Sequence, residues 1–536
     1  MEITRRTVLT GAVAAGVAAA IGVPNAAAAS TAPRPGSAAA AAASKNDTVE
    51  RWGVHELVLT GTSKGNPFVD VTLTAVYRGA GMTIKVPGFY DGDGTYRIRF
   101  SPPEVGEWTW SVDSNNRPLR KSGKLTVTAP SEGNHGPVVV APDGYHFVYA
   151  DGTPYHQIGT TSYSWAQQPE EKCQQTLATL SASPFNKIRM LVFPNVPSES
   201  VDPFVRTGSG PRDWDPTRFD PAYFRRYESR ILSLLDLGIQ ADVVLFQPYK
   251  ADIGFSDMAR PDDERYIRYV TARFGAYRNV WWSMANEYDD NETKTLEDWD
   301  HLGDFLMRVD PHSRLRSIHN KNIYYDARKA WVTHASIQSG GAAMDGIRAH
   351  LHRQFALKPV VFDEVAYEGN IDARWGQLSG EEMTSRFWNT FVGGTYCGHS
   401  ETLNEAQSPS TSWLGQGGVL NGTSAPRLAF LKQIMQDGPA TGINALQPDW
   451  GYDIGGVDNV YYMKYFGEST PTSWNALLPS GNGRTFNADI IDTWNMTVTP
   501  IGTFTMAKAT GGSQDPARPT IDLPGKPWMA VRFTAV

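Results

Sequence analysis

The sequence predicts an α/β protein in which a (β/α)8 TIM barrel is flanked by an N-terminal and a C-terminal β-sandwich domain. From about residue 151, short apolar strands alternate with amphipathic helices, and eight such units fit the usual length of this barrel. Before residue 130 and after residue 439, apolar and polar residues alternate with the period of half-buried strands. A chain of 536 residues also exceeds what one core normally supports, so several domains are expected.

Residues 1–29 have the pattern of a twin-arginine export signal. Arg5 and Arg6 precede an apolar run over residues 8–23, and the alanines at 26–29 offer a small-residue cleavage site. A transmembrane helix is the alternative, but the many Gly and Ala residues and the Pro24-Asn25 break make a poor span. Residues 30–48, rich in Ala, Pro and Ser, read as a linker. We therefore expect a secreted, extracellular protein.

The two predicted β domains cover residues 49–130 and 439–536. In the first, period-two alternation occurs over residues 69–76, 96–100 and 108–112. In the second, strand patterns occupy residues 460–466, 488–494 and 529–533. The run Asp91-Gly92-Asp93-Gly94 resembles part of a calcium loop, but no ligand-rich continuation follows, so a hairpin turn is favoured.

The predicted barrel occupies residues 137–438. Its expected strands are 156–160, 188–193, 241–246, 280–285, 314–318, 331–337, 360–362 and 394–397. Its expected helices are 171–180, 223–237, 265–274, 296–309, 343–355, 379–391 and 425–436. A doubly wound sheet is the alternative, but it would place a Gly-rich phosphate turn after the first strand, and residues 159–163 do not form one.

Composition limits the possible partners. The net charge of −7 gives no basic surface for nucleic acid or anionic membranes. The 16 Trp, 22 Tyr and 22 Phe hint at carbohydrate, since sugars stack their C–H faces on aromatic rings, although large β-rich cores account for most of them. Cys173 and Cys397 are expected to be free buried thiols, with a single bridge as the alternative. No metal or other cofactor is expected, and the oligomeric state stays open.

Two carboxylates end predicted strands on opposite walls of the barrel. The fourth strand runs into Asn286-Glu287, and the seventh runs into Asp363-Glu364. Barrel enzymes carry their chemistry at these strand ends. Glycoside hydrolysis needs one carboxyl group to protonate the leaving oxygen and another to attack the anomeric carbon or activate water. We therefore assign Glu287 as general acid/base and Glu364 as nucleophile, with Asn286 bonding a neighbouring sugar hydroxyl. Asp363 is the competing nucleophile.

Polar and aromatic residues at the other strand ends are predicted to build the sugar pocket. With Asn286, the predicted substrate-binding residues are Tyr163, Trp165, Gln247, His319, Gln338, His399, Glu401 and Trp413, and Phe193, Asn195, Tyr249 and Asn320 lie at the same strand ends. Trp165 and Trp413 are equally explained as packing residues, and His319 as a buried, satisfied histidine. Glu401 is alternatively a salt-bridge partner of Arg189. The Pro- and Gly-rich stretch 194–221 reads as a loop over the pocket.

Several motifs resemble known families. Asn286-Glu287 with Glu364 resembles the clan of TIM-barrel retaining glycosidases that carry catalytic glutamates on strands four and seven. Asp151-Gly152-Thr153-Pro154 leading into Gly159-Thr160-Thr161, and Asp363-Glu364 followed by Tyr367-Glu368-Gly369, resemble the apiosidase-like (DUF4038-like) glycosidases. That group usually reads Gly-Glu-Pro where this chain has Asp363-Glu364-Val365. The flanking motifs in residues 89–108 resemble a DUF5060-type domain, and those in residues 491–496 and 523–527 a DUF5605-type domain.

The resemblance implies a retaining glycosidase that acts on plant or microbial polysaccharide or oligosaccharide by double displacement. It does not fix the sugar, the linkage or exo against endo action. A metal-dependent barrel hydrolase is a rival, but His350 and His352 would not share a helical face and no coherent ligand set appears. A non-catalytic, exported carbohydrate-binding protein with a degenerate barrel is the other rival. Release of sugar from a glycan would distinguish an enzyme from this non-catalytic rival.

Overall fold

The computed structural model of the chain describes residues 46–196, 202–339, 344–446, 454–476, 478, 483–506 and 518–536. The predicted export signal and most of the predicted linker lie outside these residues. The part from residue 43 onward forms one compact unit. Within the described ranges, no helix combines the length and the hydropathy needed to cross a membrane.

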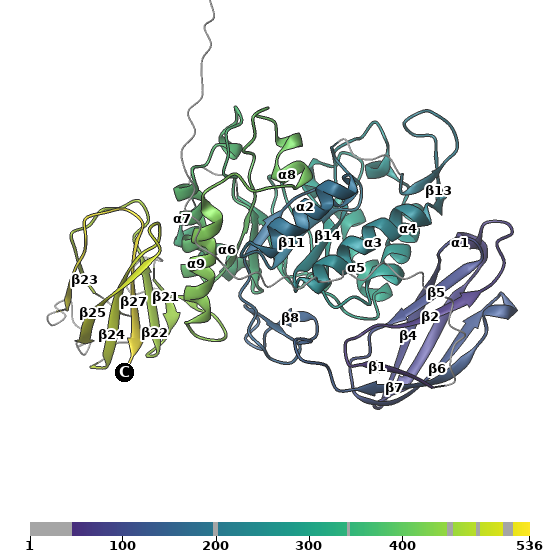
Figure 1. Cartoon of the computed structure of the whole chain (residues 1–536), viewed down its shortest axis with the longest axis horizontal. Helices are drawn as coiled ribbons and strands as arrows, with labels where there is room; N and C mark the ends of the chain where they lie inside the picture. The colour runs from purple at the N-terminus through teal and green to yellow at the C-terminus, as the bar shows by residue number, and fades with distance from the viewer. Residues whose placement is uncertain are drawn as a thin grey trace, which may run out of the picture. The chain divides into compact units, whose positions relative to one another are not determined.

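The centre of this unit is an eight-stranded parallel sheet that is barrel-like (Figure 1). Its strands are β10 (Gly159–Thr161), β11 (Lys187–Leu191), β14 (Gln240–Phe246), β15 (Val280–Ala285), β16 (Arg316–Ser317), β17 (Ala335–Gln338), β18 (Val360–Glu364) and β19 (Tyr396–His399). They pair in the order β16-β15-β14-β11-β10-β19-β18-β17. A parallel bridge between His319 and Ser336, just after β16 and within β17, joins the two ends of this order. All eight predicted strands are present, with shifted bounds.

Seven longer helices follow the barrel strands. They are α2 (Glu170–Ser181), α3 (Pro221–Asp236), α4 (Arg260–Phe274), α5 (Leu296–Val309), α6 (Gly346–Ala356), α7 (Gly380–Val392) and α9 (Ser424–Gln436). Capping boxes at Thr295 and Ser379 define the starts of α5 and α7 by satisfying backbone N–H groups that a helix leaves unpaired. Each helix lies close to where the sequence predicts it. The stretch between β16 and β17 contains no helix.

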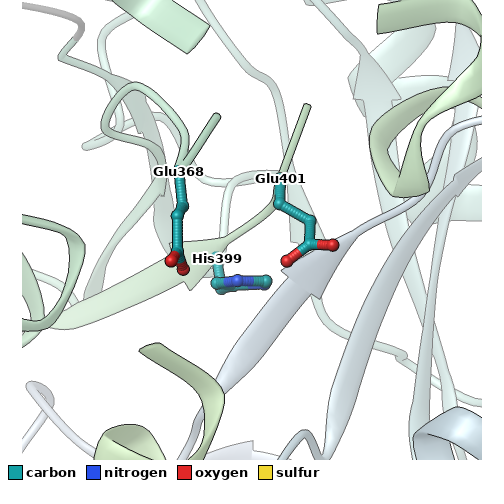
Figure 2. Close-up of side chains that lie close together, drawn as sticks. All are labelled: Glu368, His399 and Glu401. Carbon is teal, nitrogen blue, oxygen red and sulfur yellow. The ribbon is translucent and has the colours of Figure 1, made fainter. Parts of the chain in front are cut away.

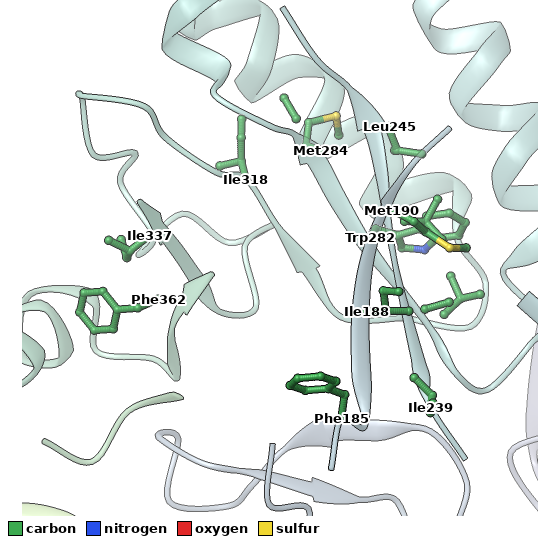
Figure 3. Packing of buried hydrophobic residues seen from close by; sticks show 14 of the residues in the cluster. Phe185, Ile188, Met190, Ile239, Leu245, Trp282, Met284, Ile318, Ile337 and Phe362 are labelled. Atoms are coloured by element: carbon green, nitrogen blue, oxygen red, sulfur yellow. The ribbon is translucent and has the colours of Figure 1, made fainter. Parts of the chain in front are cut away.

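Side chains on the barrel strands alternate between two environments. On β11, Ile188 and Met190 belong to the large hydrophobic cluster with which the strands pack against the helices (Figure 3). Lys187 and Arg189 alternate with them and form ion contacts with carboxylates of β14 and β18. The inner side of β11 is therefore charged, while its outer side is apolar. Successive side chains of a strand point to opposite faces of the sheet, which explains this period of two.

A short hairpin covers one part of the barrel. Strands β8 (Val138–Val140) and β9 (Phe147–Tyr149) pair antiparallel. Phe147 packs against Trp281 and Tyr396, with ring centroids 5.0 and 5.1 Å away. These residues form a small hydrophobic cluster of their own.

The two flanking segments consist mainly of β-strands, as predicted, but the first also contains a short helix, α1 (Pro67–Asp70), which overlaps the start of the strand pattern predicted over residues 69–76. The first has the strand order β1-β7-β6-β3-β4-β5-β2. Its strands are β1 (Asn46–Glu50), β2 (His55–Thr60), β3 (Leu73–Gly79), β4 (Met82–Tyr90), β5 (Thr95–Phe100), β6 (Gly106–Ser114) and β7 (Ser122–Thr128). The turn between β4 and β5 is the predicted hairpin turn at residues 91–94, and the Asp91 carboxylate pairs with Arg97 and Arg273. That the domain is a sandwich stays a prediction.

The C-terminal segment contains a six-stranded antiparallel sheet in the order β20-β21-β22-β27-β24-β25. Its strands are β20 (Asn444–Leu446), β21 (Ile454–Val457), β22 (Tyr461–Tyr465), β24 (Thr485–Asp492), β25 (Thr497–Thr505) and β27 (Met529–Ala535). A separate pair of strands is formed by β23 (Ser473–Asn475) and β26 (Thr520–Asp522). Ile521 of this pair belongs to one hydrophobic cluster with Phe486 and Phe533 of the six-stranded sheet. A second sandwich also stays a prediction here.

Two further predictions have clear outcomes. Cys173 and Cys397 are both free and buried, as expected. The stretch 194–221 differs from the predicted loop, because its described part contains an antiparallel hairpin of β12 (Phe204–Arg206) and β13 (Trp214–Phe219). Phe204 stacks on Trp214 at 5.0 Å and packs near Phe255, so aromatic packing gives this excursion a small core.

Candidate active site

The two glutamates of the predicted site stand at the ends of β15 and β18. Glu287 is the second residue after β15 and has φ 44° and ψ 53°, in the left-handed region that non-glycine residues seldom occupy. Such backbone strain persists only where the surroundings over-determine it, and it gathers at functional sites. Glu287 and Glu364 are 9% and 7% exposed, so both side chains are largely buried.

An irregularity in β18 explains how two adjacent acids both face the barrel interior. Ser336 of β17 pairs with Val361, but the next pair joins Gln338 to Glu364, so β18 contains one extra residue. A bulge of this kind re-aims the side chains beside it. Without it, Asp363 and Glu364 would point to opposite sides of the sheet.

Three side chains from different strands surround the Glu364 carboxylate. Arg189 Nη1 lies 3.2 Å and His319 Nε2 lies 3.5 Å from Oε1, and the Tyr163 hydroxyl donates a hydrogen bond to the same oxygen. Burial alone would raise the pKa of Glu364, but His319, Arg189 and Tyr163 stabilise the charged form and lower the pKa to about 2. Glu364 is therefore ionised at any ordinary pH.

Glu287 has the opposite tendency. Burial raises the pKa of Glu287 above its ordinary value, and the negative charge of Glu364 raises it further. A hydrogen bond from the Tyr249 hydroxyl to Glu287 Oε2, 2.7 Å long, offsets part of this rise. The site thus holds one carboxylate and one carboxyl group that retains its proton to higher pH.

Asn286 connects the two halves of the site. Its Nδ2 donates to the Tyr249 hydroxyl at 2.8 Å, and its Oδ1 accepts from Arg189 Nη2 at 2.8 Å. The Tyr163 hydroxyl lies 3.2 Å from the same Oδ1. Because every polar atom of the Asn286 side chain has a partner, the network fixes the geometry of both glutamates before any ligand arrives.

Replacing Tyr249 by Phe should move the pH dependence of catalysis. Tyr249→Phe removes a hydrogen bond that stabilises the charged form of Glu287, so the pKa of Glu287 rises. The alkaline limb of the kcat/KM profile should shift upward by about 0.5–1 pH unit. Profiles of the wild type, Tyr249→Phe and Tyr145→Phe, which lies in the turn between β8 and β9, would be compared. An alkaline limb that stays in place or moves downward contradicts the assignment of Tyr249.

Asp363 has a different role from Glu364. Its carboxylate accepts from Lys187 Nζ at 2.7 Å and from Ser336 Oγ at 2.6 Å, and the residue is 1% exposed. Lys187 also pairs with Asp242 at 2.7 Å. Although burial opposes it, the nearby Lys187 and Arg189 hold the pKa of Asp363 well below its usual range. Asp363 thus belongs to an internal ion cluster, which argues against it as the nucleophile.

Four of the other predicted pocket residues have polar groups at the site. Tyr163 and His319 contact Glu364 directly, as given above. Gln247 and Gln338, at the ends of β14 and β17, each have a buried Oε1 with no hydrogen-bond partner among the described residues. Buried amide oxygens are normally satisfied, so atoms of this kind at the strand ends are suited to accept a hydrogen bond from a ligand.

Trp165 and Trp413 are packing residues, contrary to the predicted substrate contact. They are 0% and 1% exposed and belong to the large hydrophobic cluster. The Trp413 Nε1 donates to Thr160 Oγ1 at 3.0 Å. A ring closed on all sides has no face left for a sugar, which is why the packing alternative holds.

His399 and Glu401 are also buried, together with Glu368 (Figure 2). The Glu401 carboxylate accepts from the backbone N–H groups of Asn421 and Gly422 at 2.5 and 2.8 Å, not from Arg189. Glu368 accepts from the backbone and hydroxyl groups of Thr423 and Ser424. These bonds attach the segment that leads into α9, so Glu401 anchors a loop instead of contacting substrate.

Glu368, His399 and Glu401 are also the described residues best placed to hold a cation, since one ligand atom from each lies within 4.8 Å of the others. Every carboxylate oxygen of the two glutamates already accepts a hydrogen bond. Burial raises the pKa of Glu401 to about 7, although the two backbone hydrogen bonds oppose this. Hydrogen bonds from the segment before α9 therefore stabilise both carboxyl groups.

The sequence predictions did not include two groups at the site. Arg189 was considered only as a partner of Glu401, and Tyr367 only as part of a motif. The Tyr367 hydroxyl faces Glu364: burial raises the pKa of the phenol, and the charge of Glu364 raises it further. The signal for Arg189 was present, because Lys187 and Arg189 interrupt an apolar strand with a period of two.

Comparison with known proteins identifies the family. Residues 141–411 match the family described as "Apiosidase-like, catalytic domain", and the flanks match two domains of unknown function, DUF5060 over residues 48–115 and DUF5605 over residues 450–534. The chain therefore belongs to the apiosidase-like family. A comparison with curated proteins gave no match.

Solved structures agree with this membership. A crystal structure of a provisionally assigned glycoside hydrolase from Bacteroides vulgatus ATCC 8482 is 35% identical, with a TM-score of 0.85, and the match covers 91% of this chain and all of that one. A family 5 glycoside hydrolase from the same organism is 17% identical, with a TM-score of 0.57, over 75% of this chain and 94% of the other. The second similarity shows the fold alone.

Proposed function

We propose that the protein is a retaining glycosidase built on a TIM barrel, in which Glu364 is the nucleophile and Glu287 is the general acid/base. The supporting observation is the opposite effect of the site on the two carboxyl groups. It lowers the pKa of Glu364 to about 2 and raises that of Glu287. Two titratable groups whose pKa values are pushed apart are suited to act as base and acid in one reaction.

In the proposed reaction, Glu364 Oε attacks the anomeric carbon while Glu287 donates its proton to the departing glycosidic oxygen. The covalent glycosyl ester lowers the charge on Glu364, so Glu287, now ionised, accepts a proton from water. That water attacks the anomeric carbon, the ester bond breaks, and Glu364 leaves as a carboxylate. Double displacement requires carboxyl groups about 5–5.5 Å apart.

The remaining polar groups would recognise sugar hydroxyls. Asn286 lies beside both glutamates and is positioned to bond the hydroxyl next to the reacting carbon, where a hydrogen bond strengthens as positive charge develops. The unpartnered oxygens of Gln247 and Gln338 would accept hydrogen bonds from other hydroxyls. Family membership and a 35% identical provisional glycoside hydrolase support a carbohydrate substrate, which we propose to be plant or microbial polysaccharide or oligosaccharide.

The stereochemistry of the first product tests this proposal. The purified protein would be screened against plant and microbial glycans, and the sugar released from the best substrate would be followed by proton NMR. We expect the anomer formed first to have the configuration of the substrate. An inverted anomer would exclude double displacement. A protein that binds glycans but releases no sugar would instead be the non-catalytic carbohydrate-binding alternative.

Export is a separate proposal that rests on Arg5, Arg6 and the apolar run that follows them. The mature chain should appear outside the cells of a bacterial host. Replacement of both arginines by lysine should retain it inside, and undiminished secretion of that variant would contradict a twin-arginine route.

A further inference from the structure

Trp375 differs from the other tryptophans of this protein. It is 41% exposed, and it is the one exposed tryptophan in the part of the chain that the structure describes. It lies in a single 3-10 turn, η5 (Arg374–Gly376), within the segment that follows β18 and therefore follows Glu364. In a barrel of parallel strands, this segment belongs to the face where the strands end and where the glutamates open to solvent.

Contacts connect Trp375 to the active site through one residue. The Trp375 ring packs edge-to-face against the Tyr367 ring, with centroids 6.1 Å apart and an interplanar angle of 85°. Tyr367 is buried in one hydrophobic cluster with Tyr163, whose hydroxyl donates a hydrogen bond to Glu364. The exposed indole therefore packs on the aromatic cluster that borders the nucleophile.

The backbone around Trp375 is held from several sides. Its carbonyl accepts from the Tyr367 N–H at 2.6 Å, and the next carbonyl, of Gly376, accepts from Thr402 Oγ1 at 2.9 Å. The Leu378 N–H donates back to the Tyr367 carbonyl at 2.9 Å. Gly369 and Gly376 approach each other closely, since a Cβ on Gly369 would lie 2.3 Å from the Gly376 carbonyl oxygen. The indole is exposed on a fixed support, and such a ring binds with little loss of conformational entropy.

The polar surroundings of the indole suit a carbohydrate. Asp372, Arg374 and Gln377 are exposed on the same segment, so hydrogen-bonding groups flank an apolar ring face. Arg374 pairs with Glu382. Binding sites for sugars combine a flat apolar surface with a few polar groups at its edge.

We propose that Trp375 forms the floor of a second sugar subsite, which receives the monosaccharide unit next to the one held between Glu287 and Glu364. This inference rests on the proposed function. The reacting unit must lie against the buried glutamates and amides, whereas Trp375 stands at the exposed rim beyond Tyr367. A sugar stacked there contributes binding energy to the transition state from a part of the substrate that does not react.

Two substrates that carry the same terminal sugar distinguish a role of Trp375 in the second subsite from a general effect on catalysis. The first is the oligosaccharide that the wild type cleaves best, and the second is the glycosyl fluoride of the same terminal sugar, whose leaving group is a single atom. For Trp375→Ala, kcat/KM on the oligosaccharide should fall about 10- to 100-fold, and that on the fluoride should stay within about twofold. Trp375→Phe should restore part of the loss. Phe355→Ala, which removes another exposed aromatic ring at the end of α6, where β18 begins, is the matched control and should change neither value.

Equal losses on both substrates, or no loss on the oligosaccharide, would overturn the subsite. A binding assay keeps this result distinct from a failure of the proposed function. In affinity electrophoresis through gels containing pectin, arabinoxylan or galactomannan, Trp375→Ala should lose the retardation that the wild type and Phe355→Ala share. If the wild type hydrolyses no glycan but Trp375→Ala still loses the retardation, only the proposed function is contradicted. Identical mobility of the wild type and Trp375→Ala in every gel would contradict the subsite.

Discussion

Glu364→Gln is expected to lower kcat by about 10⁴-fold or more while leaving the fold intact. The amide keeps the shape of the carboxyl group and one oxygen for Tyr163 and Arg189, but it is not a nucleophile. Covalent catalysis then has no attacking group, and only positioning and acid catalysis remain. The measurement is kcat on the best glycan substrate, with unfolding curves to confirm that the variant is folded. In Glu364→Ala, added azide should restore part of the rate by replacing the missing nucleophile.

A second buried glutamate at a strand end provides the control. Glu401 resembles Glu364 in burial but accepts its hydrogen bonds from the loop before α9. Glu401→Gln should retain at least about a third of the activity, because it removes no group that contacts the reacting carbon. If Glu364→Gln kept more than about a tenth of the wild-type rate, the nucleophile would have to be another residue.

Lys187→Met is expected to give the largest loss of stability, about 3–5 kcal/mol in the free energy of unfolding. Lys187 is 0% exposed, and its ammonium group lies 2.7 Å from both the Asp242 and the Asp363 carboxylates. Without it, two carboxylates remain in the barrel interior with much less compensating charge. Breaking a buried pair on one side is costly because the remaining charge has no water to solvate it. The shift would be measured as the urea midpoint of the barrel transition.

Lys329→Met is the matched control for this stability prediction. Lys329 also pairs with an aspartate, Asp300, but the two side chains are 34% and 36% exposed. Exposed pairs contribute about 0–1 kcal/mol, so the midpoint should hardly move. If both variants lost equal stability, or if Lys187→Met unfolded at the wild-type midpoint, the interior ion cluster would not depend on Lys187 for its stability.

Periodicity was sufficient to predict most of the fold. Strand and helix patterns switch at about residue 151, and each of the eight expected strands overlaps an observed one. Two features were harder to predict. Strand β16 contains only Arg316 and Ser317, because pairing with a neighbour, not hydrophobicity, sets strand length. The hairpin at residues 204–219 is stabilised by aromatic contacts with Phe193 and Phe255, which lie outside the hairpin in the sequence.

The candidate site was predictable where position along a strand decides the role. Asn286, Glu287 and Glu364 stand at strand ends, so their place at the barrel mouth follows from topology. The different surroundings of the Asp363 and Glu364 side chains depend on the extra residue in β18, which no sequence pattern predicts. Trp165, Trp413, His399 and Glu401 lie near strand ends too, but their side chains are enclosed by packing partners from distant segments. The direction of a side chain beyond a strand end is a tertiary property.

The identity of the covalently modified residue tests the central claim most directly. The protein would be incubated with a 2-deoxy-2-fluoro glycosyl fluoride of the sugar that it releases, which slows the second displacement and traps the ester. The account predicts a mass increase of one fluoroglycosyl group, located on Glu364 by fragmentation of the peptide that contains it. A label on Asp363 or on Glu287, or active enzyme turning over the reagent with no label at any carboxylate, would contradict it.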